Sequence, residues 1–281
     1  MKLRKVTAAS AAVLALAVTA TACGSDDKDD SSGSSSGGGN KKITIGIKFD
    51  QPGIGQKTPD GYAGFDVDVA TYVAKQLGYS DDQIQWKEAK SADRETMLQR
   101  GDVDFIAASY SINDERAAKV DFAGPYLLAH QDVLVRADDD SIKTPKDLNS
   151  KKLCSVTGST SAQNVKDKLA PKAQLQKYPT YSACLTGVQS GALDALTTDD
   201  SILAGYASQA NFKGKFKLGG FKMTNENYGI GVKKGSDLKA KIDTALEKMV
   251  SDKTWDKAVK DNFGPANYKN EPAPKIGNIV K

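Results

Sequence analysis

The chain has 281 residues, with 39 lysines and arginines against 35 aspartates and glutamates, which gives a formal net charge of +4. Three of the basic residues lie in the first five positions, so the rest carries only +1, too little for a protein that binds nucleic acid. One histidine and three cysteines offer no convincing cluster of metal ligands. The composition therefore predicts no nucleic-acid partner, no metal and no cofactor.

Residues 1–22 have the features of a signal peptide. A basic start precedes a run of small and apolar residues that is shorter than the ~20 residues of a membrane-spanning helix. Cys23 follows small residues, as at the lipidation site of bacterial lipoproteins, although TATAC lacks the usual leucine; plain secretion is the alternative. Residues 23–41, rich in glycine, serine and aspartate, are expected to be a disordered tether. We therefore expect a protein held by a lipid at the extracellular face of the cell membrane.

The globular part opens with alternating strands and helices. An alternating run at 42–48 predicts a strand that ends in Lys48 and a turn-rich segment. A helix follows, with Asp66 as its expected N-cap and apolar residues three and four positions apart. A strand at 83–87 and a short helix at 92–100 come next. This order predicts a parallel sheet with helices on its faces.

The stretch 101–126 carries the first candidate site. Apolar FIAA predicts a short buried strand, and Ser109, Ser111 and, a turn later, Arg116 follow its carboxyl end. Ligands of open α/β sheets bind beyond the carboxyl ends of strands, and a guanidinium matches the geometry of a carboxylate or phosphate. The pattern indicates an anion site, the alternative for Arg116 being a surface arginine on a helix.

An internal repeat adds a second half to this site. Residues 99–106 and 189–196 both contain a glycine that ends a helix, an aspartate three residues later and then an apolar strand. Five residues after that aspartate stand Ser109 in one copy and Asp199 in the other. Such an internal repeat predicts two similar lobes that face one another. Arg116 and Asp199 would then suit a free amino acid, which has a carboxylate and an ammonium; a structural salt bridge is the alternative.

The second copy predicts a second lobe. A strand at 152–156 runs into a hydroxyl-rich helix start at 157–161, where free N–H groups can bind an anion, although such residues are often only caps. The chain returns near 227–232, two amphipathic helices follow, and we expect a loosely held tail. The predicted organisation is a signal peptide at 1–22, a tether at 23–41, a first lobe at 42–133 and 229–270, a second lobe at 134–228 and a tail at 271–281.

Cys154 and Cys184 are the only cysteines after Cys23. In an exported protein such a pair is typical of a disulfide, the alternative being two buried thiols. A bond would join the strand that enters the Thr160 loop to the helix before the Asp199 strand and would preorganise the second lobe.

Several motifs together resemble the family 3 extracellular solute-binding proteins, the amino-acid receptors of ABC importers. They are GFDVDV with its following helix, GDVDFIAASYSINDERAAKVDFAGPY, CSVTGSTS and LTTDDSILAGY, spread over residues 43–268. KFDQPG, CSVTGSTS and TTDDSILAGY most resemble the glutamate-binding lipoproteins of high-GC Gram-positive bacteria. The resemblance implies a monomeric α/β protein of periplasmic-binding-protein type, with two lobes of mainly parallel sheet joined by two hinge strands. It also implies binding without catalysis, and an ABC permease and ATPase as partners.

The resemblance assigns roles to five residues. Arg116 corresponds to the arginine that clamps the ligand α-carboxylate, with Ser111 and the backbone N–H of Thr160 in support. Ser109 lies where a backbone carbonyl takes the α-ammonium, and Asp199 matches the carboxylate that holds it.

Departures from glutamine-binding relatives favour an acidic ligand. Lys48 stands in place of an aspartate, Ser91 in place of an aromatic residue and Val156 in place of a lysine. A ligand carboxylate in a closed cleft needs a cation, because an unpaired buried charge costs several kcal/mol. Lys48 and Arg94 are the candidates, a solvated lysine at a strand end being the alternative for Lys48. We expect glutamate, with aspartate, glutamine and asparagine open, and an enzyme or sensor on the same fold as alternatives.

Overall fold

The computed structural model describes residues 41–281, which belong to one compact unit. The predicted signal peptide, the lipidation site at Cys23 and nearly all of the predicted tether lie outside the described residues. Within residues 41–281, no helix has the length and apolar character to cross a membrane.

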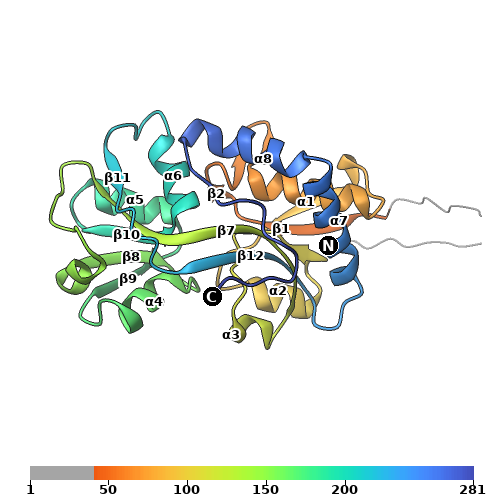
Figure 1. The fold of residues 1–281 in the computed structure, drawn as a ribbon, viewed down its shortest axis with the longest axis horizontal. Helices are drawn as coiled ribbons and strands as arrows, with labels where there is room; N and C mark the ends of the chain where they lie inside the picture. The colour runs from red at the N-terminus through yellow and green to blue at the C-terminus, as the bar shows by residue number, and fades with distance from the viewer. Residues whose placement is uncertain (1–40) are drawn as a thin grey trace, which may run out of the picture. The chain divides into compact units, whose positions relative to one another are not determined.

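The strands and helices alternate in the order that the sequence predicts for an α/β protein (Figure 1). The strands are β1 (Ile43–Ile47), β2 (Asp50–Gln51), β3 (Gly55–Thr58), β4 (Gly61–Ala63), β5 (Ile84–Glu88), β6 (Phe105–Ile106), β7 (Asp121–Arg136), β8 (Lys152–Val156), β9 (Gln174–Tyr178), β10 (Ala195–Asp199), β11 (Phe216–Leu218) and β12 (Asn225–Val232). The α-helices are α1 (Phe65–Gln76), α2 (Arg94–Arg100), α3 (Asp114–Ala117), α4 (Ser161–Lys168), α5 (Tyr181–Gln189), α6 (Asp200–Ser208), α7 (Leu238–Ser251) and α8 (Thr254–Phe263). Three short 3₁₀ helices are η1 (Asp81–Gln83), η2 (Pro145–Ser150) and η3 (Gly264–Ala266).

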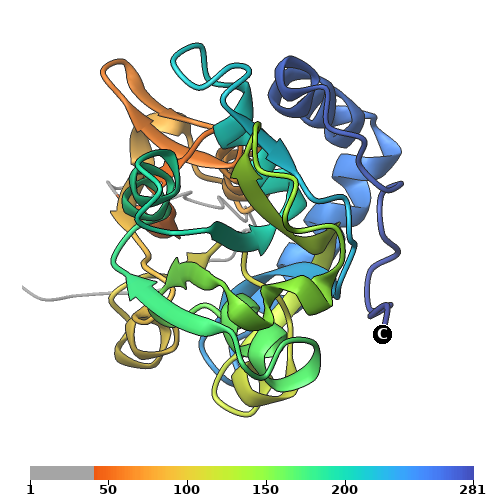
Figure 2. The same cartoon turned by 90° about the vertical axis from the view of Figure 1, so that its left-hand side faces the viewer.

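Two strands connect two lobes. The main sheet has the order β5-β1-β6-β12-β7-β10-β8-β9, with β11 beside β7. In the first lobe β5, β1 and β6 are parallel, and in the second lobe β10, β8 and β9 are parallel. The long strand β7 pairs with β12 up to His130 and with β10 from Gln131 onward (Figures 1 and 2). The predicted two-lobed fold with two connecting strands is confirmed, and β7 changes partner where one lobe gives way to the other.

The first lobe is organised around helix α1 and an aromatic core. The ring of Phe65 lies 5.0 Å from that of Phe263 and 6.0 Å from that of Trp255, and Phe65 is fully buried, as the sequence predicts. The N-cap of α1 is Gly64, with a φ of 124°, and not Asp66 as predicted. A Cβ at Gly64 would collide with the carbonyl oxygen of Ile54, so only glycine allows this approach. Asp66 therefore lies inside the helix, and its carboxylate is free for another role.

The predicted disulfide is present in the second lobe. Cys154 of β8 and Cys184 of α5 are bonded, with their Cα atoms 5.7 Å apart. The bond ties β8, which lies between β10 and β9 in the second-lobe sheet, to helix α5.

The expectation of a loosely held tail is wrong. The side chain of Asn227 in β12 donates to the carbonyl of Val280 at 2.8 Å and accepts from its N–H at 3.0 Å. Farther back, the N–H of Gly277 donates to the carbonyl of Gly124 at 2.9 Å. The tail thus runs along the two connecting strands, where backbone and amide hydrogen bonds hold it.

Candidate functional site

A small polar cavity lies between the two lobes, beyond the carboxyl ends of β6 and β10. Its lining is hydroxyl-rich and charged: Ser91, Arg94, Ser109, Ser111 and Arg116 from the first lobe, and Ser159, Thr160, Ser161, Tyr181, Thr198, Asp199 and Ile202 from the second. Six of the seven residues proposed from the sequence to contact a ligand are among them. Lys48 is not.

The first lobe contributes two buried guanidinium groups. The guanidinium carbons of Arg94 and Arg116 each lie 5.0 Å from the centre of the Tyr110 ring, within the range of cation–π attraction. Arg116 donates to the carbonyl of Ser111 at 2.8 Å, and its Nε is 3.5 Å from a carboxylate oxygen of Glu95. Arg94, by contrast, donates only to the carbonyl of Ala89, at 3.3 Å. One carboxylate faces two guanidiniums, so this wall of the cavity has an excess of positive charge.

Burial and the neighbouring Arg116 both lower the pKa of Arg94. Arg94 nevertheless stays charged, as arginines do in proteins. It is 2% exposed, and in the described part of the chain it has no carboxylate within 4 Å to compensate its charge. This arrangement favours an anionic ligand group beside Arg94.

Helix α3 fixes the direction of Arg116. The side chain of Asn113 accepts a hydrogen bond from the backbone N–H of Arg116 at 2.9 Å and thereby caps this four-residue helix. The sequence suggested an arginine on a helix only as the alternative to a site residue. In the structure it is both, because the short helix α3 places the buried side chain of Arg116 in the lining of the cavity.

Ser109 has an unusual backbone that depends on a distant residue. Its φ is 44°, in the left-handed region that a serine rarely occupies. Its N–H donates to a carboxylate oxygen of Asp66 at 2.6 Å, and the hydroxyl of Tyr126 donates to the other oxygen at 2.7 Å. Burial raises the pKa of Asp66 to about 6. The helix that begins at Gly64 thus holds the strand end at Ser109 in a strained conformation, as is typical of binding sites.

The second lobe faces this cationic wall with a helix start and a carboxylate. Thr160 precedes α4, and its side chain makes no capping hydrogen bond. Asp199 ends β10, is 4% exposed and accepts a hydrogen bond from the hydroxyl of Tyr228 at 2.5 Å. Burial raises the pKa of the Asp199 carboxyl well above its usual value. A cation would stabilise the ionised form of that carboxyl.

The lobes touch at the mouth of the cavity. The guanidinium of Arg116 reaches the carbonyl of Gly158 in the second lobe at 3.5 Å. A Cβ on Gly158, whose φ is 79°, would lie 2.5 Å from the Cα of Ala92 in the first lobe. The hydroxyl of Tyr206 donates across the lobes to the carbonyl of Asp50. The structure is therefore the closed form, in which the two lobes meet beside the cavity.

Lys48 lies outside the lining of the cavity, next to a contact between the lobes. Its ammonium is 3.1 Å from a carboxylate oxygen of Asp50, and the other oxygen of Asp50 accepts from the N–H of Tyr181 at 3.3 Å. Burial lowers the pKa of Lys48 and the charge of Asp50 opposes this shift. In the closed form Lys48 is thus an ion-pair partner of a residue that bridges the lobes.

Sequence reasoning missed the aromatic residues of the site. Tyr181 lines the cavity and accepts a hydrogen bond from the hydroxyl of Thr198 at 2.7 Å, and Tyr228 bonds Asp199 from β12. Tyr181 begins α5 after its N-cap Thr180, so its sequence context indicates only a helix start. No local pattern could have placed Tyr181 in the cavity or Tyr228 against Asp199, because both contacts join elements that are far apart in the sequence.

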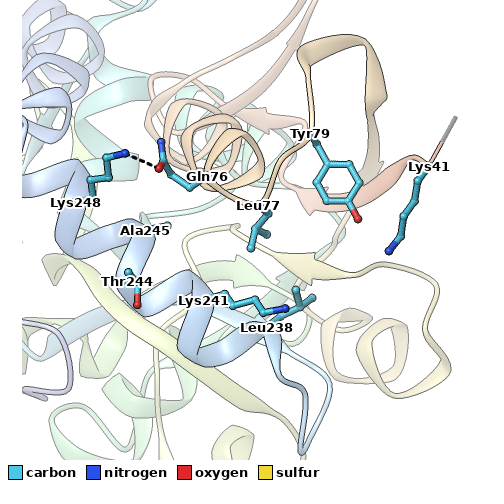
Figure 3. Close-up of a pocket in the computed structure, with 9 residues that line it drawn as sticks. All are labelled: Lys41, Gln76, Leu77, Tyr79, Leu238, Lys241, Thr244, Ala245 and Lys248. Atoms are coloured by element: carbon cyan, nitrogen blue, oxygen red, sulfur yellow. Dashed lines mark hydrogen bonds between the residues drawn. The ribbon is translucent and has the colours of Figure 1, made fainter. Parts of the chain in front are cut away.

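A roomier cavity, of about 490 Å³, lies between the end of α1 and α7 (Figure 3). Lysines at 41, 241 and 248 line it, and Lys248 donates to the side chain of Gln76 at 2.9 Å. Its lining includes no carboxylate. A zwitterion could be held there at one end only, so the smaller cavity between the lobes is the stronger candidate.

Comparisons with known proteins agree with this geometry. The family of bacterial extracellular solute-binding proteins, family 3, matches residues 43–265. The glutamate-binding protein GluB of Corynebacterium efficiens is 47% identical over 273 residues, 93% of this chain and 91% of its own. The ABC transporter glutamine-binding protein GlnH of Bacillus subtilis is 40% identical, covering 79% of this chain and 81% of its own. A solved structure of an ancestral arginine-binding protein bound to glutamine has a TM-score of 0.73 at 36% identity, covering 79% of this chain and 98% of its own.

These relatives are named for the amino acid that they bind, and not for a reaction that they catalyse. The family match spans both lobes and both connecting strands, and the predicted resemblance is confirmed. The chain belongs to the family 3 bacterial extracellular solute-binding proteins, and its role is binding rather than catalysis.

Proposed function

We propose that this protein is the lipid-anchored solute receptor of an amino-acid ABC importer, and that it closes on L-glutamate and delivers it to a membrane permease. One observation carries the proposal. The closed cavity has two buried guanidiniums on one wall and a buried carboxylate on the other. A zwitterion with a second carboxylate fits both the signs and the number of these charges.

Each ligand group has a partner of opposite character. The α-carboxylate would be held by Arg116, Ser111 and the N–H of Thr160, as the family resemblance implies. The α-ammonium would lie between Asp199 and the carbonyl of Ser109, which the left-handed backbone turns toward the cavity in this proposal.

The side-chain carboxylate would then meet Arg94, which lacks a carboxylate partner within 4 Å among residues 41–281. Lys48, whose charge is paired with Asp50, would contribute less than Arg94 to the binding of this carboxylate. The identity of 47% to a protein named as glutamate-binding supports this choice over glutamine.

Closure follows from contacts that need both lobes. Thr160 and Asp199 reach a ligand held by Arg116 only when the lobes meet, so a bound ligand stabilises the closed form. Strand β7 changes partner between His130 and Gln131, and we place the bending there.

Calorimetric titration of residues 24–281 with glutamate, aspartate, glutamine and asparagine tests the proposal. We expect glutamate to bind most tightly. Failure of every amino acid to bind would refute the receptor function, and a clear preference for glutamine would refute the charge assignment alone.

The assignment of the side-chain partner has its own test. Arg94→Gln should weaken glutamate by about tenfold or more and glutamine much less, since a buried charge pair is lost only with glutamate. Lys48→Gln should give a smaller selective loss, and the exposed Arg100→Gln is the control. Equal losses for both ligands would remove Arg94 and Lys48 from the selectivity site.

Anchoring and transport are tested in cells. The full chain should partition into detergent and the Cys23→Ser variant into the aqueous phase. Deletion of the gene should reduce uptake of labelled glutamate, and the wild-type gene should restore it. Uptake unchanged by the deletion would refute the importer role.

A further inference from the structure

The cavity between the end of α1 and α7 has no part in the proposed function, and its lining is positively charged. Lys41 lines it from just before β1, and Lys241 and Lys248 line it from α7 (Figure 3). Among residues 41–281, none of these three ammonium groups has a carboxylate oxygen within 4 Å, whereas Lys239 on the same helix is 2.7 Å from Asp243. Three positive charges therefore surround one concave surface whose lining holds no acid.

The acceptor groups at the end of α1 are already engaged within the protein. The carbonyls of residues 73–75 accept hydrogen bonds from the N–H groups of the turn that follows, at 3.0–3.1 Å. The side-chain oxygen of Gln76 accepts from Lys248 at 2.9 Å. The carboxylate of Asp81, the first acidic residue after α1, is 3.0 Å from the ammonium of Lys75. Of these groups only the neutral Gln76 amide competes with an anion for the three lysines.

The rest of the lining is apolar or carries a hydroxyl. Leu77, Leu238 and Ala245 line the cavity beside the hydroxyl-bearing Tyr79 and Thr244. Its volume of about 490 Å³ falls in the range of small-molecule sites. A phosphate group can lie against the lysine ammonium groups, and the carbon attached to it can lie against the leucines. Inorganic phosphate would leave the apolar part of the lining exposed to water, so a phosphate ester fits better.

The cavity lies where the folded part of the chain begins. Lys41 directly follows the predicted tether, and residues 24–40 separate it from the predicted lipidation site at Cys23. A stretch of that length spans at most about 60 Å when fully extended. A lipid at Cys23 therefore keeps the cavity close to the membrane surface, where phospholipid headgroups supply phosphate esters at a high local concentration.

We propose that this cavity binds the phosphodiester headgroup of an anionic phospholipid, with Lys41, Lys241 and Lys248 around the phosphate. This inference rests on the proposed membrane anchoring and goes beyond the binding of glutamate. The cavity shares no lining residue with the one between the lobes, so a headgroup and a ligand can be bound at the same time. The side of the first lobe formed by α1 and α7 then lies on the membrane.

Sedimentation of residues 24–281, which lack the lipid, with vesicles tests the proposal. We expect binding to vesicles of phosphatidylcholine with about one third phosphatidylglycerol, and little binding to phosphatidylcholine alone. The bound fraction should fall as salt is added. Lys41→Gln, Lys241→Gln and Lys248→Gln together should lower the partition coefficient about tenfold or more. Far-UV circular dichroism shows whether this variant is folded.

Lys143→Gln, Lys146→Gln and Lys172→Gln together are the matched control, since these exposed lysines of the second lobe change the net charge by the same amount. The control should bind anionic vesicles within about twofold of the wild type. Failure of the wild-type protein to bind anionic vesicles, or equal losses in the two variants, would overturn the inference and leave glutamate binding intact. Binding of glycerol phosphate without binding of vesicles would also overturn it, because the ligand would then be a soluble phosphate ester. If instead no amino acid binds, the receptor function fails, and the vesicle measurement still decides this inference.

Discussion

The two lobes hold opposite ends of the candidate ligand and use different means to stay rigid. The first lobe presents Arg94 and Arg116 on elements packed beside large aromatic side chains. The second presents Asp199 and neutral donors, and part of its core consists of small aliphatic residues such as Val165, Ala170 and Ala195. A bond between Cys154 and Cys184 links β8 to α5 in this lobe.

The difference follows from what each lobe offers to the ligand. The second lobe offers a hydroxyl-rich helix start in which the side chain of Thr160 makes no capping hydrogen bond. We infer that the disulfide steadies the strand that leads to this helix start, whereas the first lobe holds its two arginines through the Tyr110 ring and backbone carbonyls.

Loss of Arg116 should have the largest effect on binding. Arg116→Ala removes the α-carboxylate partner and leaves Glu95 without its cation, so we expect affinity for every amino acid to fall at least ~100-fold, about 3 kcal/mol. Titration calorimetry measures it, with Arg100→Ala as the control for an exposed arginine. Retention of wild-type affinity would break the assignment of the cationic end to the first lobe.

Removal of the disulfide should chiefly affect the second lobe. The bonded residues are 30 positions apart, and closing a loop of this length contributes about 3–4 kcal/mol to stability. Cys154→Ser with Cys184→Ser should lower the urea midpoint, and amide exchange should quicken more in β8 and α5 than in α1. Uniform exchange throughout the chain would contradict the division of rigidity between the lobes.

Asp66 should give the first lobe a characteristic pH dependence. Its pKa is raised from 3.8 to about 6, so its contribution to stability is full below pH 3.8 and is lost as pH rises through 6. The difference is on the order of 2–3 kcal/mol. Asp66→Asn should remove this slope in urea unfolding between pH 4 and 7, and the exposed Asp60→Asn should not. An unchanged slope in Asp66→Asn would mean that Asp66 titrates normally.

A substitution at the lobe contact should have the smallest effect. Gly158→Ala brings a Cβ within 2.5 Å of Ala92 and should hold the lobes apart, weakening glutamate by about tenfold, or ~1.4 kcal/mol. Gly214→Ala is the matched control, because its φ of 76° gives the same backbone strain with no atom within 4 Å of the new Cβ. Small-angle scattering should show a more open average only for Gly158→Ala. Equal effects would mean that strain, and not closure, weakens binding.

Much of the architecture could be predicted from local patterns. The alternation of strand and helix, the repeat around Gly101 and Gly191, and the polar residues after each strand were enough to pair Arg116 with Asp199 across a cavity. Boundaries were less secure. Asp66 was expected as the N-cap of the first helix, whereas Gly64 holds that place, because its close approach to Ile54 lies outside the pattern of the helix itself.

The sequence by itself determined which charged groups follow which strands, since turn residues and apolar periodicity are properties of neighbouring positions. Only the tertiary structure decided their partners. Asp66 supports Ser109 from 43 residues away, Asp50 neutralises Lys48, and Tyr228 bonds Asp199 from a strand that returns late in the chain. Which charges compensate one another depends on long-range packing and burial, and the spacing of residues in the sequence predicts neither the packing nor the burial.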